Sequence, residues 1–181
     1  VFARLEVRKA LSLAIDRNAL VEDVLGGYGT PAEGPVPTGL LPEPSTSVEE
    51  GDRIAEAAEV LEASGWVYDT TERVWKNEKD GLSLSVTLST SNVPELKAIA
   101  EEMRRAWQKL GVEVSTEFHD PNELVANVIR PREYDALLFG MVVGRDQDLF
   151  AFWSSSERND PGLNVSMYAN RDVDLLLEKI R

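Results

Sequence analysis

The 181-residue sequence predicts an α/β fold with a largely parallel sheet flanked by helices. Three observations lead to this expectation. Strand-like and helix-like segments alternate after residue 80, which is typical of α/β domains. Residues 82–89 alternate between apolar and polar side chains with a period of two, as in a strand with one buried face. Residues 134–139 form a mostly apolar run, which is typical of a strand buried on both faces.

The first part of the chain predicts two helices and a long loop. Apolar residues recur at helical spacing from Val7 to Ala14, and Asp16 suits the N-cap of a second, short helix that ends at a Gly-Gly pair. Residues 26–47 contain five Gly and five Pro, so this segment cannot be helical. A loop of this length in a compact domain is often functional or held by a partner surface.

The middle of the chain predicts two further helices and a strand. Residues 51–64 carry an apolar stripe that Gly65 ends, and residues 94–110 carry another that Gly111 ends. Residues 112–118 then alternate with the period of a strand. Each of these helices is expected to end at its glycine, because a left-handed residue there satisfies the last helical carbonyl groups.

The end of the chain predicts a short helix at residues 122–129, cut by Pro131, and a helix at residues 172–181 with no residue that closes it. The chain begins without an initiator Met or an apolar signal segment. We therefore expect residues 1–181 to form a single domain cut from a longer protein. The absence of a signal segment then says nothing about where that protein is located.

Composition disfavours several classes of function. The chain has 32 acidic and 19 basic residues, a net charge of −13, so nucleic acids and anionic lipid surfaces are poor partners. It has no Cys, which excludes disulfides, thiol catalysis and thiolate zinc sites. Its single His, His119, is expected at the surface, and we expect no metal or cofactor. No apolar run approaches the ~18 residues of a membrane helix.

Motifs for catalysis are incomplete in this sequence. Residues 154–156 are three serines that lack the Gly-x-Ser-x-Gly elbow and a His partner. Residues 26–29 are rich in Gly but lack the Lys-Ser/Thr pair of a phosphate-binding loop, so we interpret them as the end of a helix. We expect no enzyme activity, and a hydrolase that uses a carboxylate pair is the remaining catalytic alternative.

A loop after the last strand-like run holds the candidate binding residues. Asp146 and Asp148 lie in this loop, and ligands of open α/β sheets bind beyond the carboxyl ends of strands. The two carboxylates are expected to face a ligand, to be solvated in the loop, or to cap the N-terminus of a helix. Trp153 follows the loop beside Phe150 and Phe152, so it forms either a wall of a ligand site or a packing contact.

Longer segments of the chain resemble one known family. They are residues 7–21, the Gly-Tyr-Gly-Thr-Pro-Ala and Gly-Pro-Val-Pro motifs at 27–32 and 34–37, and residues 57–66, 82–90, 94–114, 134–140, 152–155, 164, 168–170 and 173–176. Taken in order, they resemble the family 5 extracellular solute-binding proteins. These are the peptide-, oligopeptide- and nickel-type receptors of bacterial ABC importers, and the likeness covers nearly the whole chain.

The resemblance implies a type II periplasmic binding-protein fold, of which residues 1–181 are most of the C-terminal lobe. The implied protein is the substrate-binding component of an ABC importer. It captures peptides or similar small solutes outside the cytoplasmic membrane, and its partners are the permease subunits. It is periplasmic or extracellular, with membrane contact through the permease or a lipid anchor. A ligand-sensing domain of a transcription regulator is the alternative.

The resemblance also implies a ligand surface between residues 140 and 153. Peptide receptors of the family carry a Trp and, three residues later, an acid that pairs with the peptide's amino group. Met141 and Gly144 stand at these positions, so the usual ammonium anchor is missing. The expected ligand contacts are the backbone groups of Gly140 and Gly144, Met141, the carboxylate of Asp146 or Asp148, and the ring of Phe152 or Trp153.

Overall fold

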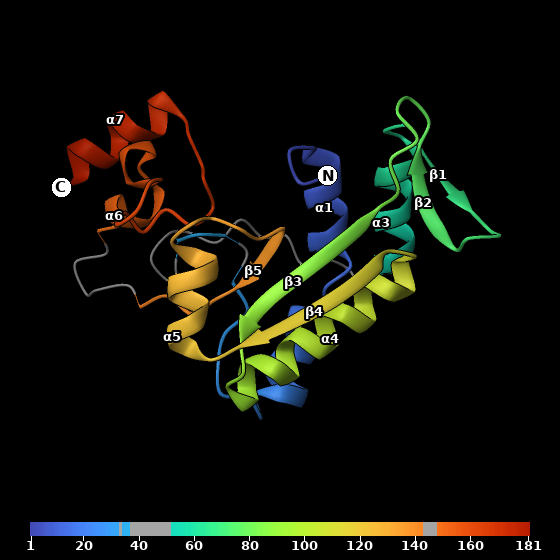
Figure 1. Ribbon diagram of the computed structural model, residues 1–181, viewed down its shortest axis with the longest axis horizontal. Coiled ribbons are helices and arrows are strands. Elements are labelled where there is room, and N and C mark those ends of the chain that lie inside the picture. Colours follow the sequence, from blue (N-terminus) through green and yellow to red (C-terminus); the bar gives the residue numbers. More distant parts are fainter. Residues whose placement is uncertain (33, 37–51, 143–147) are drawn as a thin grey trace.

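The computed structural model describes residues 1–32, 34–36, 52–142 and 148–181. The central feature of this part of the chain is a three-stranded sheet with the strand order β4–β3–β5 (Figure 1). The strands are β3 (Ser85–Ser91), β4 (Glu113–His119) and β5 (Ala136–Leu138). β3 pairs in parallel with both neighbours, so the predicted α/β fold with a largely parallel sheet is confirmed.

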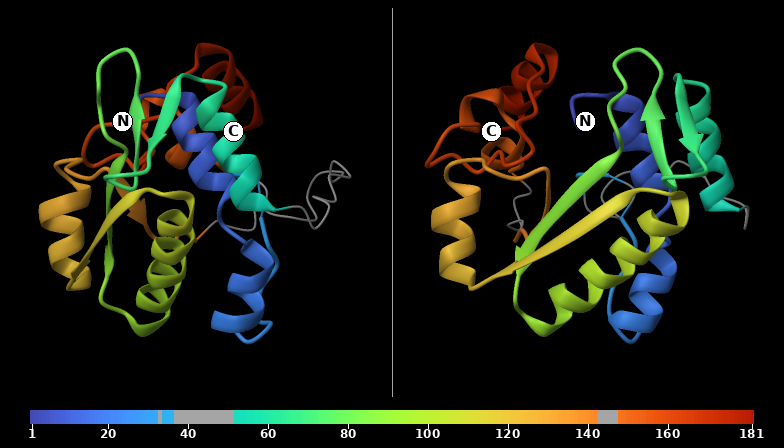
Figure 2. Two further views of the ribbon diagram at one scale, coloured as in Figure 1. Left: turned by 90° about the vertical axis from the view of Figure 1, so that its right-hand side faces the viewer. Right: turned by 45° about the vertical axis from the view of Figure 1, so that its right-hand side comes forward.

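The predicted helices lie close to their expected positions, short π turns extend some of them, and α6 and η3 are helices that the sequence did not predict. They are α1 (Leu5–Leu13), α2 (Arg17–Ala19), η1 (Leu20–Val24), α3 (Arg53–Glu62), α4 (Pro94–Leu110), α5 (Pro121–Glu123), η2 (Leu124–Ile129), α6 (Phe150–Trp153), η3 (Ser155–Glu157) and α7 (Arg171–Ile180). Figure 2 shows α1, α3 and α4 on one side of the sheet and η2 on the other. Parallel strands need such crossover helices, because a tight turn cannot join them.

Local chemistry fixes where several helices begin and end. The Asp16 carboxylate accepts a hydrogen bond from the Ala19 N–H at 3.0 Å, which confirms the predicted N-cap. Asp52 caps α3 in the same way, although the sequence analysis did not predict it. α4 ends at Gly111, whose φ is 90° and where the Tyr68 ring leaves no room for a Cβ.

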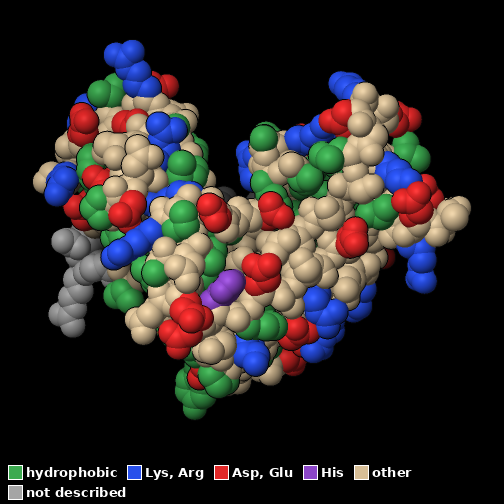
Figure 3. Space-filling view, in the orientation of Figure 1, with side chains coloured by type: hydrophobic (Ala, Val, Ile, Leu, Met, Phe, Trp, Pro, Cys, Tyr) green, Lys and Arg blue, Asp and Glu red, His purple; other side chains and the backbone are tan. Residues whose placement is uncertain are grey.

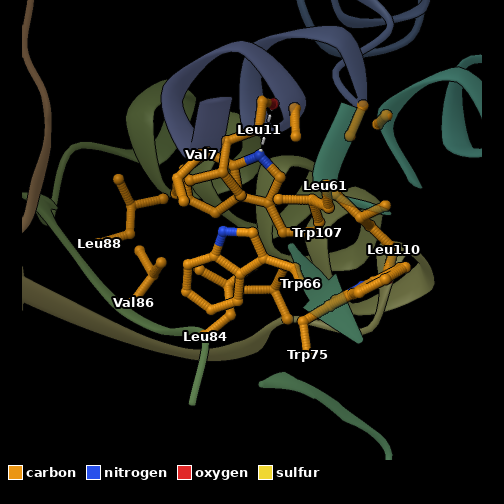
Figure 4. Close-up of a cluster of buried hydrophobic side chains, with 14 of the residues drawn as sticks. Val7, Leu11, Leu61, Trp66, Trp75, Leu84, Val86, Leu88, Trp107 and Leu110 are labelled. Carbon is orange, nitrogen blue, oxygen red and sulfur yellow. Dashed lines mark hydrogen bonds between the residues drawn. The ribbon is translucent and has the colours of Figure 1, made fainter. Parts of the chain in front are cut away.

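Three indole rings fill the main core between the sheet and helices α1, α3 and α4 (Figure 4). Trp66, Trp75 and Trp107 are all buried. The Trp107 Nε1 donates to the Leu11 carbonyl at 2.8 Å, and the Trp75 Nε1 donates to the Leu110 carbonyl at 2.6 Å. Rings of this size bury about 150–250 Å² each, so they dominate the core's contribution to stability.

An antiparallel hairpin lies beside this core and was not anticipated from the sequence. It consists of β1 (Trp66–Asp69) and β2 (Val74–Asn77), in the register Trp66 with Asn77. Asp69 organises its turn, because its carboxylate accepts from the Thr71 and Glu72 N–H groups and from the Lys76 Nζ at 2.9 Å. The Glu72 N–H and the Lys76 ammonium together lower the pKa of Asp69 to about 2.

β5 differs from the strand that the sequence predicts. The expected strand buried on both faces is shorter, and all of its residues are only half-buried. Ala136 and Leu138 pack against the main core, while Leu137 packs against a smaller core of Leu124, Val128 and Ile129. Both faces of β5 therefore contact apolar side chains. β5 is partly exposed because, within the described residues, it is an edge strand that pairs only with β3.

The segment from α6 to α7 lies apart from α1 and the hairpin. In Figure 3 the surface is hollowed between these two parts. The predicted C-terminal helix is confirmed as α7, with Asn170 as its N-cap. No residue of α7 is buried, so the part of the chain that the structure describes leaves its Leu175, Leu176 and Ile180 exposed.

The exposure of His119 agrees only in part with the prediction that it lies at the surface. Its side chain is 26% exposed, and its Nε2 lies 3.6 Å from a carboxylate oxygen of Glu117. The His119 side chain is partly buried because His119 is the last residue of β4 and pairs with Ser91 of β3. The described residues contain no group of three His, Asp or Glu placed to hold a metal ion, and none of their helices is long and apolar enough to cross a membrane.

Candidate ligand-binding pocket

A cavity of about 490 Å³ lies beyond the carboxyl end of β5, and we call it the β5 cavity. Segments far apart in the sequence meet there. Its lining residues are Val125, Ile129, Arg130, Arg132, Leu137, Phe139, Gly140, Met141, Val142, Phe152, Trp153, Asp160, Pro161, Gly162, Leu163, Val165 and Ser166. Ligands of open α/β sheets bind at this end of the strands, and known pockets for small molecules have volumes of about 300–1,000 Å³.

One side of the cavity, the strand wall, consists of Val125, Ile129, Leu137 and Phe139. Val125 and Ile129 are four residues apart in η2, which places them about one turn apart on the same face. Leu137 joins the small core beneath them. Phe139 follows β5 and is 47% exposed. The wall therefore has a packed base and an apolar edge that is open to solvent.

The opposite side, the loop wall, consists of Phe152, Trp153, Pro161, Gly162, Leu163 and Val165. Trp153 ends α6, and its ring meets the Tyr168 ring edge-on with centroids 6.1 Å apart. Trp153 therefore packs against a neighbour and also lines the cavity, and its role as a wall of a ligand site stays a prediction. Its Nε1 is shielded from solvent and has no hydrogen-bond partner in the described part of the chain.

Asn164 holds the loop wall together from within. Its side chain is fully buried. Its Nδ2 donates to the carbonyls of Ser154 and Tyr168, both at 2.9 Å. Its Oδ1 accepts from the Ser166 hydroxyl at 2.9 Å and from the Tyr168 N–H at 3.2 Å. One buried amide therefore uses both its donor and its acceptor atoms to shape the segment that follows Trp153.

The charged side chains at the cavity are few. Arg130 and Asp160 form an exposed ion pair at 3.7 Å, which contributes little to stability. Arg132 has no carboxylate partner among the described residues. The hydroxyl of Ser166 donates to Asn164, and the lining contains no His, Cys or Lys that could act as a base or nucleophile beside it. This chemistry suits the binding of an apolar group.

The structure brings together four of the residues that the sequence analysis proposed as ligand contacts. Gly140, Met141, Phe152 and Trp153 all line the β5 cavity. Met141 is 41% exposed there, so an apolar side chain is open to solvent at the position where peptide receptors of the family carry a Trp. Gly144 and Asp146 lie outside the described residues, and their roles stay predictions.

Asp148 is the remaining proposed contact, and it does not line the cavity. Its Oδ1 accepts from the Phe150 N–H at 2.9 Å at the start of α6. Its Oδ2 lies 3.7 Å from the Nε of Arg181, whose guanidinium sits 4.9 Å from the centre of the Phe150 ring. Asp148 thus accepts from the first N–H of α6, although Leu149 is the N-cap residue, and its role toward a ligand stays a prediction.

Sequence reasoning missed the parts of the cavity contributed by η2 and by residues 160–166. Val125 and Ile129 belonged to a short predicted helix with no mark of function, and Leu163 and Val165 lay in an unassigned segment. Arg132, a charged residue directly after Pro131 at the end of a helix, was the one local signal available. The walls meet only through the pairing of β5 with β3, which a pattern along the chain does not reveal.

Fold and cavity together define an α/β lobe with an apolar cavity beyond the carboxyl end of β5. The chain belongs to the bacterial extracellular solute-binding proteins of family 5, because the model of the middle part of that family matches residues 1–161. The resemblance inferred from the sequence is therefore confirmed.

The relatives of the chain include two bacterial proteins. It is 28% identical to the oligopeptide-binding protein AppA of Bacillus subtilis over 98% of this chain and 33% of AppA. It is 32% identical to protein XP55 of Streptomyces lividans over 95% of this chain and 31% of XP55. The chain thus spans about a third of the length of these relatives.

The chain also resembles a solved structure of this family in its fold. The chain matches the structure of AppA in complex with a nonapeptide with a TM-score of 0.83 and 27% identity, over 98% of this chain and 36% of that chain. The predicted periplasmic binding-protein fold is therefore confirmed for the region that this chain covers.

Proposed function

We propose that the chain is part of the substrate-binding component of an ABC importer. In this role the full protein captures peptides or similar small solutes outside the cytoplasmic membrane and delivers them to a permease. The observation that carries the proposal is the β5 cavity in a member of the family 5 solute-binding proteins. Peptides are favoured as the substrate class by AppA, whose solved structure holds a nonapeptide.

The β5 cavity takes an apolar side chain of the bound solute in this proposal. Gly140, Met141, Phe152 and Trp153 contact it, and their support is that they line a mostly apolar cavity. Polar contacts come from Gly144 and from the carboxylate of Asp146 or Asp148 in the loop between β5 and α6. The support for these contacts is sequence position alone, and Asp148 does not line the β5 cavity. The proposal assigns no catalytic role to the lining, in which the Ser166 hydroxyl donates to Asn164.

Residues 1–181 supply one side of a cleft in this proposal, as most of the C-terminal lobe of a two-lobe receptor. Its support is that the chain spans about a third of AppA. The receptor acts in the periplasm or outside the cell, consistent with the family's description as extracellular. It meets the membrane through the permease or a lipid anchor elsewhere in the protein. A net charge of −13 disfavours nucleic acid as a partner.

Native mass spectrometry of the full-length protein, purified from its host, tests the proposal. We expect a population of protein molecules that carries additional mass, which tandem fragmentation identifies as peptide. Full-length protein that carries no small solute and gains none from a peptide mixture added at high concentration contradicts the proposal. Unfolding of the same sample before analysis is the control, because it releases a noncovalent ligand and leaves a covalent modification in place.

A further inference from the structure

Arg132 connects the two walls of the β5 cavity. Its Nη1 donates to the Ile129 carbonyl on the side of the strand wall at 2.6 Å. From the same guanidinium, Nε donates to the Arg158 carbonyl at 3.0 Å and Nη2 donates to the Gly162 carbonyl of the loop wall at 2.7 Å. One planar, charged group thus binds three backbone oxygens from segments about 30 residues apart.

The backbone of Arg132 is in a conformation that favours glycine. Its φ is 62°, in the left-handed region that a residue with a Cβ rarely occupies. Such a conformation costs free energy and persists only where surrounding contacts hold it. The three hydrogen bonds of the Arg132 side chain stabilise this backbone conformation. They require the guanidinium to point from the turn after η2 toward residues 158–162.

The loop wall has little freedom to take up another position near this contact. A Cβ on Gly162 would overlap the backbone of Glu157, so the chain passes very close to itself there. Tyr134 adds a second connection, since its hydroxyl donates to the Val165 carbonyl, and burial raises its pKa. The exposed ion pair between Arg130 and Asp160 is a looser link between the same segments.

We propose that Arg132 is a positioning residue that sets the spacing between the strand wall and the loop wall, and thereby the size of the side chain that the β5 cavity accepts. The inference rests on the proposed function, because it assumes that the cavity receives a solute. Arg132 acts through the loop wall, since its Nε, Nη1 and Nη2 are each engaged with a protein carbonyl.

Replacing Arg132 by Gly separates the side-chain contacts from the backbone conformation. Glycine adopts a φ of 62° without strain, so R132G removes the hydrogen bonds and leaves the turn possible. The matched control is Arg73→Gly. Arg73 has a φ of 59° in the turn between β1 and β2, is exposed, and has no side-chain hydrogen bond or ion pair among the described residues.

The experiment uses the full-length protein and two measurements. Amide hydrogen exchange without ligand reports on residues 158–166. Competition binding with short alanine-based peptides, in which Phe replaces one Ala at a time, reports on selectivity. We expect R132G to accelerate exchange in residues 158–166 by about tenfold, the size expected for one net hydrogen bond from a charged donor. We also expect it to lose most of the wild-type preference for Phe at the preferred position, while R73G changes neither measurement.

Wild-type exchange rates in R132G, or faster exchange with an unchanged preference, overturn the proposal, because Arg132 then has at most a structural role. Recovery of part of the preference in R132K supports it, since a Lys ammonium can still reach carbonyl oxygens of both walls. If the wild-type protein binds none of these peptides, nor any other peptide offered, the proposed function fails. In that case, the exchange comparison still decides whether Arg132 fixes the loop wall.

Discussion

The carboxylate of Asp174 accepts hydrogen bonds from both the N–H and the hydroxyl of Ser155, at 2.8 Å and 2.6 Å. This contact joins α7 to η3, directly after the Trp153 end of α6. No residue of α7 is fully buried, and this polar contact is one of those that join α7 to the segment after Trp153.

Replacing Asp174 by Asn should remove the pH-dependent stability that the Asp174 carboxylate contributes. The hydrogen bonds from Ser155 hold the pKa of Asp174 below its ordinary value of 3.8. The ionised carboxylate therefore stabilises the folded state above pH 3.8, and this contribution is lost as the pH falls through the lowered pKa. Thermal unfolding should show D174N less stable than wild type at pH 7, with the difference vanishing in acid. D172N, which changes an exposed acid on the same helix, is the control, and an equal loss there contradicts the assignment.

Replacing Asn164 by Ala should destabilise the loop wall. The change leaves the carbonyls of the buried Ser154 and of the partly exposed Tyr168 without the Nδ2 donor, at a cost of about 1–3 kcal/mol. Chemical denaturation measures the loss, and N159A, at an exposed position in the same segment, should change stability by less than about 0.5 kcal/mol. Equal effects of the two substitutions would show that the hydrogen bonds of Asn164 contribute nothing measurable.

Replacing Met141 by Ala should weaken solute binding and leave the fold intact. Met141 lines the β5 cavity and is 41% exposed, so its side chain can still gain burial from a ligand. Burying part of a Met side chain is worth about 1 kcal/mol, which corresponds to an affinity loss of about fivefold. M167A is the matched control, because Met167 is 42% exposed and does not line the cavity. Calorimetric titration with a bound peptide compares the two, and equal losses exclude a specific role for Met141.

Replacing Trp107 by Phe should cost about 2–3 kcal/mol of stability. The smaller ring leaves a void in the main core and removes the donor to the Leu11 carbonyl, which joins α4 to α1. Urea denaturation of the variant measures this loss. A change below about 0.5 kcal/mol would mean that the core rearranges around the new ring without penalty.

The sequence predicts elements whose signal is local. Helix α4 is an example, since Pro94 begins it, an apolar stripe defines its buried face and Gly111 ends it. The Asp16 cap is another, because its hydrogen bond spans three residues. The β1–β2 hairpin escapes such reasoning, as its turn is built by the side-chain hydrogen bonds of Asp69 and by a left-handed Arg73 rather than by Gly or Asn.

The candidate site is predictable only where it lies on one continuous segment. Trp153 is found from its position after the last strand, and Met141 from the resemblance to the family. Val125 and Leu163 reach the same cavity because β5 pairs with β3 and because Arg132 binds the Gly162 carbonyl. These are contacts between distant segments, and neither periodicity nor a motif encodes them. Asp148 is a case in which sequence position suggested a ligand contact, whereas the structure shows its carboxylate accepting a hydrogen bond from the Phe150 N–H.

Isothermal titration of short peptides into the full-length protein and into the 181-residue chain tests the central claim most directly. If the chain is one side of a cleft in a solute-binding receptor, the full-length protein binds peptides with micromolar or tighter Kd, about 8 kcal/mol or more of binding free energy. The isolated chain then gives weak or undetectable heat. Absence of binding by the full-length protein to every peptide and other solute offered, or micromolar binding by the chain alone, contradicts the account.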